Sequence, residues 1–312
     1  MSPSKIKIPG SHGLVAYLIT VAAWVVYVAL QLMAPTNAQN IYHIHPAEIT
    51  ILQLTYLIPL LIIWLVAVYG ASAFKHYADL LGNSKEGKAM HLIANALYWT
   101  IAYLVVASIF GSLLPFYTNS PGFAGLIILR DHLSALLTLV AFLLFYRGAN
   151  LLRMVAKFET WTAQTFVILG LYLAFAAVLI WRFSLVSPST AGTMSHSALQ
   201  YVPSSVLLFT LLLPYLVAWF LGILAAVNLS KYAMVVKGVL YRKALGDLVK
   251  GIWSVVVFSI IVQILTLLSR ALALLPLGSV LVLIYLIVLL YALGFVFVRA
   301  GAVKLARIEV AR

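Results

Sequence analysis

Long apolar stretches alternate with short polar connections along the chain. Eight of these stretches approach the length of about 20 residues that an α-helix needs to cross a hydrocarbon core. Because backbone groups inside a bilayer must hydrogen-bond within their own segment, such stretches predict helices. The sequence therefore predicts an all-α integral membrane protein with eight transmembrane helices, at residues 14–34, 50–74, 91–114, 131–147, 163–186, 205–229, 252–275 and 279–299.

Basic residues divide unevenly between the two ends of these predicted helices. Seventeen of the 20 lysines and arginines fall on the side that carries both termini, and the exceptions are Arg130, Arg182 and Arg270. The positive-inside rule places that side in the cytoplasm, so we expect a multi-pass protein of the cell (plasma) membrane with cytoplasmic N- and C-termini. The same asymmetry explains the net charge of +13. We attribute the basic stretch 230–251 to lipid headgroups and do not expect nucleic acid as a partner.

The chain repeats itself at an offset of 155 residues. Four spans per unit give both copies the same orientation, which predicts a parallel repeat about an axis along the membrane normal. We expect one four-helix membrane repeat at 1–158 and a second at 159–312, with the two aligned prolines forming kinks at their interface. The register aligns Pro59 with Pro214, Trp64 with Trp219 and Tyr77 with Tyr232.

Few polar side chains fall inside the predicted spans. All seven acids lie in loops or at span ends, whereas ion-coupled carriers usually need a buried ionisable group, so this distribution argues against active transport. Asn95 and Gln263 are the amides placed deep in the membrane. Each is expected to join helices through hydrogen bonds, with contact to a substrate as the alternative.

Composition excludes several kinds of chemistry. The chain is 64% hydrophobic and only 9% charged, far from the average of soluble domains. Because it contains no cysteine, it has no disulfide, thiolate metal site or c-type haem. No histidine lies deep in a span, and the motifs of phosphate-binding loops and hydrolases are missing. We therefore expect no cofactor and no intrinsic catalytic activity, and we rank an enzyme acting on lipids last.

A histidine pair on the outer side is a candidate metal site. His43 and His45 alternate in a connection that also contains Glu48. Alternate side chains of an extended segment point the same way, so this group could share a Zn or Cu ion with His132 as a further ligand. Contact with water and headgroups is the alternative.

A charged group at the start of the fourth span is a candidate contact surface. Arg130, Asp131 and His132 follow one another there. They could receive a partner protein or a quinone headgroup at the outer surface, with snorkelling of Arg130 to lipid phosphates as the alternative.

These patterns favour a cofactor-free membrane subunit that anchors or assembles a larger complex, with respiratory electron transfer as the setting suggested by fold-level analogy. Its expected partners are the lipid bilayer and other membrane or peripheral subunits. The alternative is a passive channel, translocation pore or transporter, including one for a macromolecule such as nucleic acid. The small number of deep polar groups favours the subunit, because a pore must hydrate what passes through it.

Overall fold

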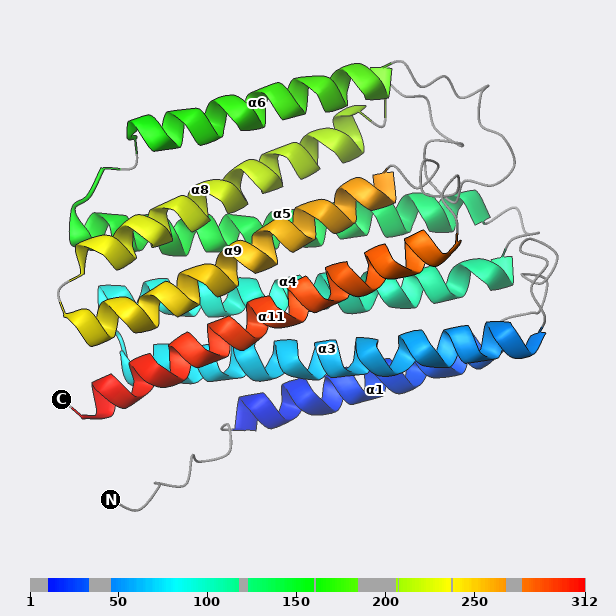
Figure 1. Cartoon of the computed structure of the whole chain (residues 1–312), viewed down its shortest axis with the longest axis horizontal. Coiled ribbons are helices and arrows are strands. Elements are labelled where there is room, and N and C mark those ends of the chain that lie inside the picture. Colours follow the sequence, from blue (N-terminus) through cyan, green and yellow to red (C-terminus); the bar gives the residue numbers. More distant parts are fainter. Residues whose placement is uncertain are drawn as a thin grey trace.

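The computed structural model describes residues 11–33, 46–117, 123–159, 161–184, 206, 208–236, 238–267 and 277–311. The regular elements in these ranges are all helices (Figure 1). Eight stretches are long and apolar enough to cross a membrane, which confirms the predicted class and number of spans.

The helices are longer than most of the predicted apolar stretches. A hydropathy pattern marks only the part of a helix that contacts hydrocarbon, and these helices continue past it into charged segments. In chain order they are α1 (Ser11–Met33), α3 (Pro46–Leu80), α4 (Lys85–Tyr117), α5 (Phe123–Ala156), α6 (Ala163–Ser184), the π-helical turn η4 (Leu208–Leu212), α8 (Leu213–Val235), α9 (Val239–Leu267) and α11 (Leu277–Val310).

The helices form one bundle, with α1 and α6 at opposite edges (Figure 1). The last helix of each predicted half packs against the second helix of the other half, since α5 contacts α8 and α11 contacts α3. We call the end where α1 begins and α11 ends the basic end, because Lys75, Arg147, Lys231 and Lys250 mark the limit of the apolar stretches there. The opposite end is called the far end.

In each predicted half, a glycine brings two helices into backbone contact. A Cβ atom on Gly148 of α5 would stand 2.8 Å from the carbonyl oxygen of Ala89 in α4. A Cβ atom on Gly301 of α11 would stand at the same 2.8 Å from the carbonyl oxygen of Ala244 in α9. A side chain larger than hydrogen would therefore force these helix pairs apart.

Gly148→Ala is expected to lower the free energy of unfolding by about 1–3 kcal/mol, because overpacking outweighs the better helix propensity of alanine. Gly170→Ala in α6 is the matched control, since nothing lies within 4 Å of a Cβ atom there. Thermal unfolding of the two variants in detergent measures the difference. Equal midpoints for both variants would show that the close approach of α4 and α5 is not needed.

Candidate functional site

A buried ion pair lies inside the bundle toward the far end. Arg130 and Asp131 are near the start of α5, and Asp131 is only 6% exposed. Nη2 of Arg130 is 2.6 Å from Oδ1 of Asp131, and Nε donates a hydrogen bond of 2.8 Å to the same oxygen. A carboxylate in such a place needs a charged or hydrogen-bonding partner, so the two residues form one unit.

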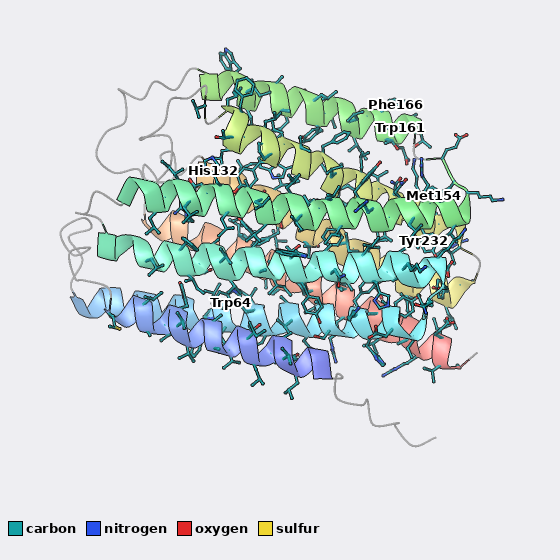
Figure 2. The ribbon with its side chains drawn as sticks, turned by 180° about the vertical axis from the view of Figure 1, so that it is seen from behind. Trp64, His132, Met154, Trp161, Phe166 and Tyr232 are labelled. Atoms are coloured by element: carbon teal, nitrogen blue, oxygen red, sulfur yellow. The ribbon has the colours of Figure 1, made fainter. Side chains whose placement is uncertain are left out.

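The sixth span begins irregularly beside this pair. The π-helical turn η4 directly precedes α8, and Pro214 occupies the first turn of α8. His132 of α5 lies next to η4, with its Nε2 3.0 Å from Oγ1 of Thr210 (Figure 2). π-Helical turns occur frequently at functional sites, so this level of the bundle carries a second feature typical of one.

Gln263 connects three helices deep in the bundle. Its side chain is 1% exposed on α9. The amide nitrogen donates a hydrogen bond of 2.7 Å to Oγ1 of Thr138 in α5, and the amide oxygen accepts one from Nε1 of Trp219 in α8. Thr138 in turn donates to the carbonyl oxygen of Ser134, over 2.8 Å. The amide therefore has partners on both sides, and one of them belongs to the other predicted half.

Two tyrosines link the ion pair to the amide. Tyr103 of α4 and Tyr215 of α8 are each 4% exposed. The Tyr103 hydroxyl lies within electrostatic reach of both Gln263 and Asp131, while the Tyr215 ring stacks on Trp219 with a centroid distance of 5.9 Å. We call this group the polar site, and its members are Tyr103, Arg130, Asp131, Thr138, Tyr215, Trp219 and Gln263.

Two buried hydroxyls next to the polar site have no hydrogen-bond partner within the described part of the chain. One belongs to Tyr291 of α11, which lies within electrostatic reach of Tyr103. The other belongs to Ser259, one helical turn from Gln263 on α9. Buried polar groups are nearly always paired, so these two hydroxyls are unusual in having no partner.

A second polar group lies at the basic end. The hydroxyls of Tyr77 in α3 and Tyr241 in α9 are 2.5 Å apart, and the Tyr232 hydroxyl of α8 donates to the Glu86 carboxylate of α4 over 3.1 Å. Figure 2 shows Tyr232 at the opposite end of the bundle from His132. We call these four residues the tyrosine cluster, and both of its bonds join one predicted half to the other.

Phenylalanines fill the core between the two polar groups. Phe142 and Phe145 of α5 and Phe295 of α11 are almost completely buried. The Phe142 ring packs on the α8 backbone so closely that a Cβ atom on Gly222 would stand 2.7 Å from it. This aromatic layer separates the polar site from the tyrosine cluster.

The structure places the predicted metal ligands and prolines as follows. His43 and His45 lie outside the described residues, Glu48 is in the first turn of α3, and the described ranges contain no group of three potential metal ligands. The two prolines differ locally, because Pro59 lies inside the continuous helix α3 whereas Pro214 follows η4.

The predicted amides and charged residues differ in how far they are buried. Asn95 is exposed on α4, so the interhelical contact expected of it is not seen, whereas Gln263 joins three helices. Of the two charges expected at the outer surface, Asp131 is buried and Arg130 is only partly exposed. Sequence reasoning missed Tyr103, Tyr215 and Thr138, which carry no signal of their own in a helix. Trp219 and Tyr232 do carry a signal in the sequence, because the same residue types stand 155 positions before them.

Comparison with known protein families, curated proteins and solved structures gives no match to this chain. The geometry of its polar groups is therefore the basis for any functional conclusion.

Proposed function

We propose that the protein is a carrier that moves a small polar solute across the membrane between its two four-helix halves, residues 1–158 and 159–312. The polar site is the observation that carries this proposal. Ionisable and amide groups inside a bilayer are costly and by default suggest function, and here an ion pair connects to an amide through two buried tyrosines. The basic end is proposed to face the cytoplasm, with the protein in the cell membrane.

Matched contacts support the division into two equivalent halves. Tyr77 contacts Tyr241, and Tyr232 contacts Glu86. Tyr77 and Tyr232 are 155 positions apart, and so are Glu86 and Tyr241, so one contact is the counterpart of the other. The glycine contacts of α5 with α4 and of α11 with α9 repeat in a similar way. These pairs favour a parallel repeat about an axis through the bundle.

The distribution of polar groups along the interface favours a carrier over an open pore. A pore must hydrate or coordinate its solute along the whole path, which a packed layer of phenylalanines does not do. Polar contacts between the halves at both ends, with an apolar layer between them, suit halves that rock against each other and open one end at a time.

The chemistry of the polar site favours a neutral or zwitterionic solute. Arg130 and Asp131 cancel each other's charge, so the site carries little net field for a cation or an anion. The Tyr291 and Ser259 hydroxyls offer further hydrogen bonds. The sequence-based argument against carriers rested on acids confined to loops and span ends, and it loses force because Asp131 is buried.

The membrane-subunit hypothesis is the second candidate, together with its respiratory setting and quinone contact. It is favoured by the exposed apolar side chains along α6, among them Phe166, Leu173 and Trp181, where a helix of another subunit could pack. On this hypothesis the polar site holds the helices together permanently and does not bind a solute.

Whether the bundle opens at the basic end distinguishes the carrier proposal from the membrane-subunit hypothesis. Because the chain has no cysteine, Ser134→Cys introduces a unique thiol next to the polar site. Tyr77→Phe with Tyr232→Phe removes two hydrogen bonds between the halves, each contributing about 0.5–1.5 kcal/mol. We expect these changes to accelerate labelling of the thiol by an impermeant maleimide about tenfold, because weaker contacts favour the open state.

The control is Tyr146→Phe, a partly buried tyrosine of α5 outside the tyrosine cluster, which should leave the labelling rate unchanged. Proteoliposomes given glycerol, urea or glycine gradients should equilibrate faster than protein-free vesicles with at least one of these probes. If the thiol labels only after denaturation and no probe crosses, the carrier proposal is wrong and the subunit hypothesis is favoured.

A further inference from the structure

A groove runs along α6 where this helix faces α8 and α9. It has a volume of about 290 Å³ and is lined by apolar and aromatic side chains, including Ile168, Phe175 and Ile260. A second space of only about 10 Å³ shares Ile168 and Tyr172 with this groove and reaches Thr165 near the basic end. Together they form a track of apolar surface that begins beside Trp219 and ends at a polar residue.

The first helix of each predicted half packs against the bundle in a different way. α1 packs against both α3 and α4, whereas α6 packs mainly against α8 and η4. One fixed point near the middle of α6 is the Tyr172 hydroxyl, which donates to the carbonyl oxygen of Leu216. The groove therefore occupies a crevice that a closer helix would fill, and it opens toward the lipid.

A lysine marks the end of the groove at the basic end. Nζ of Lys231 in α8 donates to Oγ1 of Thr162 over 2.8 Å and to Oγ1 of Thr165 over 2.9 Å. The main-chain oxygen of Glu159 accepts a longer bond of 3.3 Å, and the Glu159 carboxylate lies within electrostatic reach. An ammonium beside two hydroxyls is complementary to a phosphate group, which would replace the longest of these three bonds, the one to Glu159.

Aromatic residues place this lysine at headgroup depth. Trp161 stacks on Phe166 with a centroid distance of 5.7 Å, and both are about half exposed at the start of α6 (Figure 2). Tryptophan is enriched at the membrane–water interface, where its amphipathic ring meets the headgroups. Thr162 directly follows Trp161, so the ammonium bound to it lies at the same level.

We propose that the groove binds an anionic phospholipid of the leaflet at the basic end. One acyl chain lies between α6 and α8, and the phosphate group lies at Lys231 and Thr162. The apolar lining contacts the acyl chain, and the lysine provides the charge that selects an anionic headgroup. This inference does not depend on the transported solute.

Native mass spectrometry of the full chain with phosphatidylglycerol or phosphatidylcholine tests the proposal. Lys231→Met is expected to weaken phosphatidylglycerol binding about fivefold, whereas Lys231→Arg retains it. Ile168→Trp fills the groove without touching the hydrogen bonds of Lys231, and it should weaken binding even if Lys231→Met fails to fold. Glu159→Gln should strengthen binding, because it removes a negative charge near the headgroup.

Two matched controls accompany these variants. Lys250→Met removes an exposed lysine of the basic end, and Leu173→Trp adds the same bulk on α6 outside the groove lining. The proposal is overturned if the two lipids bind equally well. It is also overturned if Leu173→Trp weakens binding as much as Ile168→Trp, if Lys250→Met weakens it as much as Lys231→Met, or if crosslinking from Ile168 in cells captures a protein helix instead of lipid.

Discussion

Arg130→Met is expected to lower the free energy of unfolding by about 3–5 kcal/mol, because it removes the cation that pairs with the buried Asp131 carboxylate. The change keeps a long side chain, so lost packing contributes little. Denaturation of the purified protein in detergent measures the loss. A transporter built on this pair should also lose its flux in proteoliposomes.

The double variant Arg130→Met with Asp131→Leu distinguishes loss of the pair from loss of one partner. Replacing a buried pair by apolar residues is often neutral, so the double variant should recover most of the stability but none of the flux. Arg242→Met is the control, since Arg242 is exposed on α9. If Arg130→Met is as stable as the wild type, the Asp131 carboxylate does not depend on Arg130.

Gln263→Leu is expected to cost about 2–3 kcal/mol. A single interhelical hydrogen bond in a bilayer averages only about 0.6 kcal/mol, but this amide has two partners on different helices. Leucine would leave the indole nitrogen of Trp219 buried without an acceptor, and such a group costs about 1–3 kcal/mol by itself. The stability measurement is the same as for Arg130.

Asn95→Leu is the matched control for Gln263→Leu, because it makes the same replacement at an exposed position of α4. It should leave stability unchanged within about 0.5 kcal/mol. Combining Gln263→Leu with Trp219→Phe removes the donor together with its acceptor, so it should cost less than the sum of the two single changes. Strict additivity would mean that the indole and the amide do not interact.

The number of spans followed from the sequence because a hydrocarbon core imposes a fixed apolar length, a constraint that each segment meets on its own. The ends of the helices could be predicted less well from the sequence. α3 continues through Lys75 and Asp79 to Leu80, beyond the apolar stretch from which it was predicted, because a helix can leave the bilayer without ending.

The polar site could be predicted only in part, because burial depends on which helices meet. Gln263 and Asn95 look alike in the sequence, yet Gln263 is hydrogen-bonded to two other helices and Asn95 is exposed. The partner of Gln263 in α5 is 125 residues away, a separation that no local pattern reports. For the same reason the sequence predicts surface positions for Arg130 and Asp131, since charged residues near a span end are common in loops.

The length of the helices has a consequence for how the bilayer acts on the protein. α3, α4, α5 and α11 contain 33–35 residues each and are about 50 Å long, against a hydrocarbon core of about 30 Å. In the tyrosine cluster, Tyr77 follows Lys75 and Tyr232 follows Lys231, so both tyrosines lie beside the charged residues that mark the end of the apolar stretches. A change in bilayer thickness would therefore move the boundary between lipid and water along these helices, toward or away from the tyrosine cluster.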